Sequence, residues 1–118
     1  MSWLGAPNLA VLEKFLDLAA MRETLVSTNL ANVDTPGYHT RDVDFRGELQ
    51  RAMDGMADGT TSALVMPVRG LLARPDGNNV NVDRESMLLA ETQLQFKAAT
   101  AILRSEFAEI HTAIREGQ

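Results

Sequence analysis

Hydrophobic residues recur at helical spacing in two long segments, one towards each end of the chain. In the first segment, apolar side chains follow steps of three and four residues from Leu9 to Val33. Pro7 and Asn8 suit the first turn of a helix. The residues expected to pack include Leu12, Leu16 and Leu30. We therefore predict an N-terminal helix that ends near residue 33 and buries one broad face.

The second periodic segment runs without a helix breaker from Asp83 to Glu116. Asp83 is a suitable N-cap, and Arg115 and Gly117 are typical of a helix end. A row of large apolar side chains, based on a seven-residue spacing, comprises Leu89, Phe96, Leu103, Phe107 and Ile110. At 1.5 Å per residue this helix is roughly 50 Å long, whereas a compact globule of this size is about 35 Å across. The sequence predicts an elongated molecule or a subunit of an assembly.

A second row on the same predicted helix consists mostly of small residues. Its members are Leu94, Ala98, Ala101, Ser105, Ala108 and Thr112. Small side chains allow another helix to approach closely, and one thin partner cannot cover both rows. A monomeric helical bundle is the alternative, but it would leave a sizeable apolar strip in water. We therefore expect neighbours on more than one side of this helix.

Two amides near the end of the first helix indicate a specified turn. Asn29 and Asn32 lie three residues apart on one helical face, which is unfavourable in a packed interface unless they bond the backbone as it turns away. Pro36 disfavours helix at Thr35, and the Pro36–Gly37 pair suits a type II turn. The chain is expected to change direction there.

The middle of the chain is expected to be irregular. Alternation over 41–45 and the spacing of Phe45, Leu49 and Met53 predict a short extended piece and a short helix. Residues 54–62 are rich in Gly, Asp and Thr and predict a mobile loop; residues 63–68 predict a short edge strand, and residues 75–77 a turn. The fold class is all-α dominated: an elongated antiparallel pair of long terminal helices, coiled-coil-like, around a loop-rich middle. We divide this single unit into 1–33, 34–82 and 83–118.

Composition narrows the function classes. The 118 residues are 45% hydrophobic, carry a net charge of −5 and include no cysteine. The sequence has no Lys/Arg cluster with interleaved aromatics, which argues against nucleic acid as a partner. It also has no run of about 18 apolar residues, so we predict no membrane span. The first residues have no basic region of the kind that opens a cleaved signal peptide. Without cysteine, disulfides and thiolate metal sites are excluded.

Candidate chemistry is sparse. Neither His39 nor His111 has a second ligand or a catalytic partner at a recognisable spacing. Asp42 and Asp44 lie two residues apart, but no apolar pocket is indicated around them, so turn hydrogen bonding is the expected role. Residues 76–85 lack the Gly and the final Glu of a calcium loop. We predict a protein that is not an enzyme and has no catalytic residue, metal or cofactor.

Residues 29–32, Asn-Leu-Ala-Asn, followed by residues 34–38, Asp-Thr-Pro-Gly-Tyr, closely resemble the N-terminal motif of the flagellar rod, hook and hook-associated axial proteins. Residues 41–45, 76–80 and 83–85 are similar to the proximal-rod branch of that family, and the resemblance covers nearly the whole chain. The candidate assembly motif comprises Asn29, Asn32, Asp34, Thr35, Pro36, Gly37, Tyr38, Arg41, Asp42 and Phe45.

The resemblance implies a structural role in the bacterial flagellum. Such a subunit is exported by the flagellar type III apparatus without a cleaved signal peptide, pairs its terminal helices in the proximal rod within the periplasmic space, and transmits torque. The implied partners are further copies of the chain, other rod proteins, the adaptor protein FliE, the inner-membrane ring and the export gate. The alternative is a cytosolic helical adaptor or export chaperone of the flagellar secretion system that binds partner helices in a groove.

Overall fold

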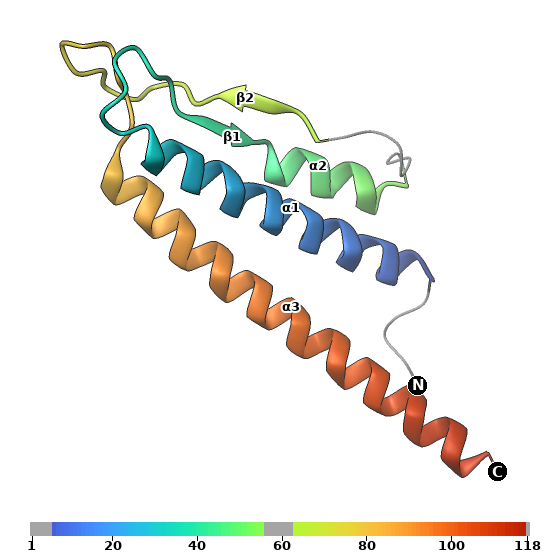
Figure 1. The fold of residues 1–118 in the computed structure, drawn as a ribbon. Coiled ribbons are helices and arrows are strands. Elements are labelled where there is room, and N and C mark those ends of the chain that lie inside the picture. The colour runs from blue at the N-terminus through green and yellow to red at the C-terminus, as the bar shows by residue number, and fades with distance from the viewer. Residues whose placement is uncertain (1–5, 56–62, 118) are drawn as a thin grey trace.

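Two long helices lie side by side in antiparallel orientation and define the shape of the molecule (Figure 1). The computed structural model describes residues 6–55 and 63–117. Helix α1 spans Ala6–Ala31, and helix α3 spans Val82–Glu116. The molecule measures 68 × 27 × 18 Å. The predicted elongated pair of terminal helices is confirmed, with α1 ending two residues earlier than expected.

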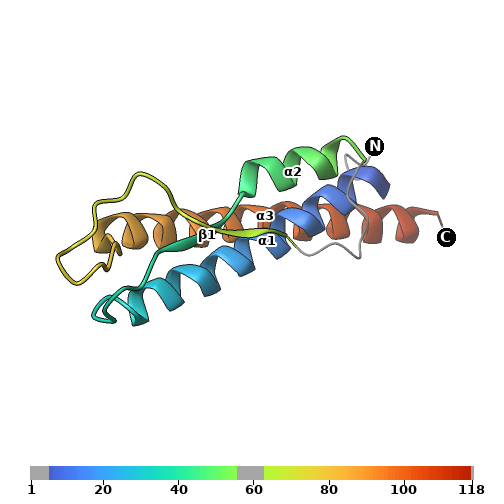
Figure 2. The ribbon, with the colours of Figure 1, turned by 90° about the horizontal axis from the view of Figure 1, so that it is seen from above.

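The middle of the chain packs along the opposite side of α1 from α3 (Figures 1 and 2). Strand β1, Arg41–Val43, leads into helix α2, Phe45–Met53, and β2, Val65–Pro67, pairs antiparallel with β1. The predicted short helix and the short edge strand are therefore confirmed. Most of the predicted loop at 54–62 lies outside the described residues.

Helix α1 buries two faces because it is the central layer of the molecule. On one face, Leu18 forms a core with Val43 and Ala63, and Phe15 meets Phe45 edge-to-face with ring centroids 5.3 Å apart. The other buried row recurs every seven residues and lies at helical spacing from Glu23, which lines a depression together with Gln93 of α3. Its members are Leu12, Ala19 and Val26. This central position explains why the apolar stripe in the first helix is so broad.

The buried row of α3 differs from the predicted one. It consists of Glu85, Thr92, Ala99 and Glu106, again spaced by seven residues. The predicted row of large side chains lies at the margin of the contact or beyond it: Leu89 and Leu103 are half-buried, whereas Phe96, Phe107 and Ile110 are 42%, 58% and 43% exposed. On α1, Leu12 is buried and Leu16 and Leu30 are half-buried. Phe107 and Ile110 are therefore not buried between the two helices of one subunit, whereas Phe96 lines a depression together with Glu23 of α1. The packing role of this row stays a prediction.

Two physical reasons account for this difference. The small residues Thr92 and Ala99 allow α3 to approach α1 more closely than a row of large side chains would. In addition, α3 continues past the first described turn of α1, so its last turns extend beyond the helix pair (Figure 1). The start of α3 also differs, because Asn81 rather than Asp83 is the N-cap and accepts a bond from the Arg84 N–H at 3.0 Å. In the described segments, no helix has the combination of length and hydropathy that a bilayer crossing requires.

Candidate functional site

The predicted turn begins at the last residues of α1. The side-chain nitrogen of Asn32 donates to the Thr28 carbonyl at 2.8 Å, and its oxygen accepts from the Thr35 hydroxyl at 3.1 Å. The Tyr38 N–H donates to the Thr35 carbonyl at 3.2 Å, and Gly37 has φ +75°. This is the hydrogen bond and the backbone conformation that a type II turn over Pro36–Gly37 requires. The change of direction predicted from Asn32, Pro36 and Gly37 is confirmed.

Asn29 joins three elements from inside the protein. Only 1% exposed, it uses both ends of its amide. The nitrogen donates to the Arg41 carbonyl at 2.9 Å and to Glu85 Oε2 at 3.0 Å, while the oxygen accepts from the Tyr38 hydroxyl at 2.8 Å and the Arg41 N–H at 3.1 Å. The amide therefore holds the backbone of β1 as a neighbouring strand would, and links it to α3. Buried amides are stable only when their bonding groups are paired in this way.

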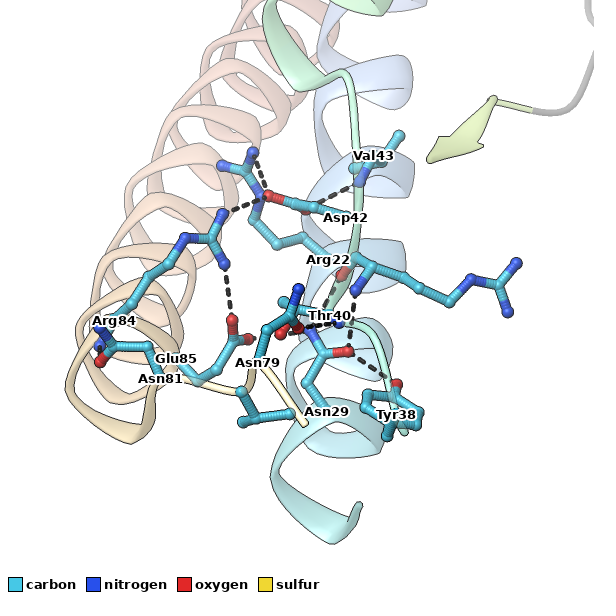
Figure 3. A network of polar contacts seen from close by, with 12 residues as sticks. Arg22, Asn29, Tyr38, Thr40, Asp42, Val43, Asn79, Asn81, Arg84 and Glu85 are labelled. Carbon is cyan, nitrogen blue, oxygen red and sulfur yellow. Dashed lines mark hydrogen bonds and ion pairs between the residues drawn. The ribbon is translucent and has the colours of Figure 1, made fainter. Parts of the chain in front are cut away.

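A chain of alternating charges continues from Glu85 across the molecule (Figure 3). Glu85 is fully buried, and its second oxygen accepts from Arg84 at 2.6 Å. Arg84 also reaches Asp42 at 3.3 Å, and Arg22 meets the same carboxylate with two nitrogens at 3.1 and 3.3 Å. The Arg22 guanidinium stacks 5.0 Å from the centre of the Phe45 ring. Two positive and two negative groups thus neutralise one another between α1, β1 and α3.

The segment before α3 closes the site from the other end. Asn78 is fully buried and donates to the carbonyls of Asn32 and Thr35, both at 2.8 Å. Arg74 donates to the Val33 carbonyl, which satisfies another backbone group at the end of α1. The Thr40 N–H donates to the Asn79 side chain at 2.7 Å. These bonds fix the turn and the start of α3 relative to each other. We call this whole set of bonded residues the polar joint. Its side chains are those of Arg22, Asn29, Asp42, Asn78, Asn79, Arg84 and Glu85.

Two glycines allow the two loops of the polar joint to touch. The Gly37 N–H donates to the Asp76 carbonyl at 2.9 Å, and Gly77, with φ +84°, lies opposite. A Cβ built on Gly77 would stand 3.4 Å from the Gly37 Cα. Close approach and positive φ are both properties that favour glycine. The predicted turn at 75–77 is present, since the Gly77 N–H donates to the Arg74 carbonyl at 2.8 Å.

The other residues of the predicted motif contribute unequally. Asp34, Thr35, Pro36 and the side chain of Arg41 are exposed, whereas Tyr38 and Phe45 are half-buried. Sequence reasoning missed the partners in the polar joint: Arg22, Asn78, Asn79, Arg84 and Glu85. The available signal was the Asn78–Asn79 pair directly before a helix, because such amides commonly bond to backbone groups.

The electrostatics of the polar joint favour uncharged tyrosine. Burial raises the pKa of the Tyr38 phenol; the Arg41 charge opposes this shift and the Glu85 charge adds to it. Among residues 6–55 and 63–117, no three His, Asp or Glu side chains are grouped as metal ligands would be. His39 and His111 are both exposed. What the arrangement can do is mechanical: it holds α1, β1 and α3 in one geometry.

A second surface of interest is the outer part of α3. Large apolar side chains remain exposed there, including Leu94 at 69%, Phe107 at 58% and Ile114 at 59%. All members of the small-residue row from Leu94 to Thr112 are also exposed. A shallow hollow lined by Ser105, Ala108, Ile110 and Thr112 lies among them. Apolar surface of this kind is typical of protein interfaces.

Comparison with known proteins supplies the family context. No family model matches the chain. The flagellar basal body rod protein FlgB of Yersinia ruckeri is 31% identical over 89% of this chain and 91% of its own length. FlgB of Escherichia coli K12 is 30% identical with the same coverage, and FlgB of Cereibacter sphaeroides is 34% identical over 92% of this chain and 94% of its own length. The similarity therefore includes both long helices and the polar joint.

Proposed function

This chain belongs to the FlgB family of flagellar basal body rod proteins, and on that basis we propose that it is a proximal-rod subunit that assembles through its two long helices and transmits torque. A structural component of the basal body rod needs interfaces and stiffness rather than a reaction centre. The exposed face of α3 offers an interface, and the polar joint offers stiffness.

The uncovered apolar surface of α3 is the observation that carries this proposal. Phe107, Ile110 and Ile114 recur at helical spacing in the last turns of α3 and are 58%, 43% and 59% exposed. On the opposite side of α3, the small-residue row from Leu94 to Thr112 is also open. Burial of such side chains stabilises an assembly by about 25 cal/mol for each Å² of apolar surface removed from water. Neighbouring subunits in the rod would cover both faces.

The polar joint would transmit load between the wall of the rod and the segment that leaves it. Because Asn29 bonds both backbone groups of Arg41, rotation of β1 relative to α1 breaks buried hydrogen bonds. The paired charges of Arg22, Asp42 and Arg84 connect β1 to both long helices. Such multiply connected polar networks resist partial opening. Residues 41–45 would in this way meet the next subunit at a fixed angle.

Family membership also supports the proposed location and partners. We place the subunit at the base of the rod in the periplasmic space, beside other rod proteins, the adaptor protein FliE, the inner-membrane ring and the export gate. Export by the flagellar apparatus without a cleaved signal peptide belongs to the same proposal.

The test uses the exposed Phe107. Cells that lack the parent protein would produce either Phe107→Asp or the matched control Leu72→Asp, which changes an apolar side chain that is 94% exposed outside the helices. We expect Phe107→Asp to abolish motility and to be missing from purified basal bodies, and Leu72→Asp to retain both. Circular dichroism of the purified variants checks that both remain helical. Parent-level incorporation of a folded Phe107→Asp chain would contradict the proposal.

A further inference from the structure

We propose that Glu85, held by Asn29, fixes the register of α3 along α1. This inference concerns the subunit itself and does not depend on the proposed role in the rod. It assigns to Glu85 a positioning role: its carboxylate makes one alignment of the two helices favourable and the neighbouring alignments unfavourable.

Packing between the two helices leaves the register poorly defined. The buried row of α1, Leu12, Ala19 and Val26, repeats every seven residues, and Thr92 and Ala99 are seven residues apart in the buried row of α3. Leu89, Phe96 and Leu103 beside that row repeat at the same interval. A slip of α3 by seven residues, about 10.5 Å along the helix axis, would place similar side chains opposite one another. Apolar contacts alone discriminate weakly between these alignments.

The polar ends of the α3 row remove this ambiguity. Glu85 and Glu106 precede and follow Thr92 and Ala99 in the same buried row. A seven-residue slip in one direction brings Glu85 into the site of Thr92, and a slip in the other direction brings Glu106 into the site of Ala99. Thr92 and Ala99 occupy sites that are only 1% and 3% exposed. A carboxylate moved into such a site without its own partners is strongly unfavourable.

Only the observed register gives Glu85 its partners. Asn29 donates to one carboxylate oxygen at 3.0 Å, and Arg84, while bonded to the other oxygen, reaches Asp42 on β1. The same Asn29 amide holds the backbone of Arg41. The Asn29 side chain therefore bonds both to α3 and to the strand that follows the turn after α1. A single buried polar contact is known to specify register in paired helices.

Cysteine crosslinking can measure the register directly, because the chain has no cysteine of its own. Glu23 on α1 and Gln93 on α3 line the same depression. A Glu23→Cys and Gln93→Cys pair, treated with a short thiol crosslinker, reports the observed register. Glu23→Cys combined with Thr100→Cys or with Ser86→Cys reports a seven-residue slip in either direction. The crosslinked fraction of the purified full chain is read from gel mobility.

Replacement of both members of the Asn29–Glu85 pair avoids leaving either of these two side chains buried without the other. In a chain that carries Asn29→Leu and Glu85→Leu, we expect slipped-register crosslinks to rise by at least about tenfold over the parent background. The conservative Glu85→Gln, which still presents an acceptor to Asn29, should retain the observed register. Thr92→Val is the matched control, because Thr92 Oγ1 is buried and has no hydrogen-bond partner among the described residues.

The outcomes decide between two origins of the register. Slip in the double variant, together with an unchanged pattern in Glu85→Gln and Thr92→Val, supports the proposal. If the double variant crosslinks only through the Glu23→Cys and Gln93→Cys pair, as the parent does, packing and the segment before α3 set the register and the proposal is wrong. Equal slip in Thr92→Val would also overturn it, because the effect would then not be specific to Glu85.

Discussion

Replacement of Asn29 by alanine tests whether the polar joint stabilises the fold. The substitution removes four hydrogen bonds, with donor–acceptor distances from 2.8 to 3.1 Å. Glu85 is fully buried and loses one of its two partners, whereas Tyr38 and Arg41 lie closer to solvent, where water replaces part of what is lost. The main loss of stability therefore comes from the carboxylate.

The expected magnitude follows from these differences in burial. An unsatisfied buried carboxylate oxygen costs about 2 kcal/mol, and the partly buried bonds to Tyr38 and Arg41 add about 1.5 kcal/mol together. Alanine is a better helix former than asparagine by roughly 0.5 kcal/mol, which offsets part of this loss. The net loss of about 3 kcal/mol is a large fraction of the stability of a typical domain, which is roughly 5 to 15 kcal/mol.

Urea unfolding followed by circular dichroism measures this loss. With a slope of about 2 kcal/mol per M, Asn29→Ala should lower the unfolding midpoint by about 1.5 M. The matched control is Asn32→Ala, since among the described residues the Asn32 amide bonds to two exposed neighbours, Thr28 and Thr35. It should lower the midpoint by about 0.5 M or less. Equal midpoints for the two variants would refute the reasoning, because burial of the amide would then make no difference.

Three further predictions concern the turn and the charges around it. Gly37→Ala should destabilise the protein by about 1 kcal/mol in thermal unfolding, because φ is +75° and no atom obstructs the new methyl group; an unchanged melting temperature would contradict this. Tyr38 is the only tyrosine, and its phenol absorbance should titrate above the usual pKa of 10.0. The raised pKa favours the neutral phenol in the folded protein. The contribution of Tyr38 to stability is therefore complete below the pKa of Tyr38 in the unfolded chain and is lost as pH rises through its pKa in the folded protein. If Tyr38 has the same pKa in the urea-unfolded chain, burial is not the cause of the shift. Arg22→Met should cost about 1.5 kcal/mol, with a coupling to Asp42→Asn of about 1 kcal/mol in a double-mutant cycle, and strictly additive effects would show that the pair is unimportant.

The turn at the end of α1 was predictable because its signals are local. Asn32, Pro36 and Gly37 restrict the backbone or bond to it within a few residues, and the structure places each as expected. The partners of Asn29 were not predictable in the same way. Glu85 lies 56 residues further along the chain, and no spacing rule connects the two positions before the helices are paired.

The face of α3 that meets α1 shows a similar limit. Seven-residue spacing occurs in the large row that contains Leu89 and Leu103 and also in the row that contains Thr92 and Ala99. Hydrophobicity favours the first row, but close approach of two helices favours small side chains. Periodicity identifies a helix with several possible contact faces, and it does not select between them.

The sequence by itself determined the two long helices, the change of direction at residues 34–37 and the short helix from Phe45. These features depend on local backbone preferences and on periodic hydrophobicity, which are properties of neighbouring residues. Only the tertiary structure decided that Asn29, Asp42, Arg84 and Glu85 form one neutral network, and that Phe107 and Ile110 remain uncovered in the subunit. The physical reason is that burial and charge pairing depend on which distant segments meet, and that is fixed only when α3 lies against α1.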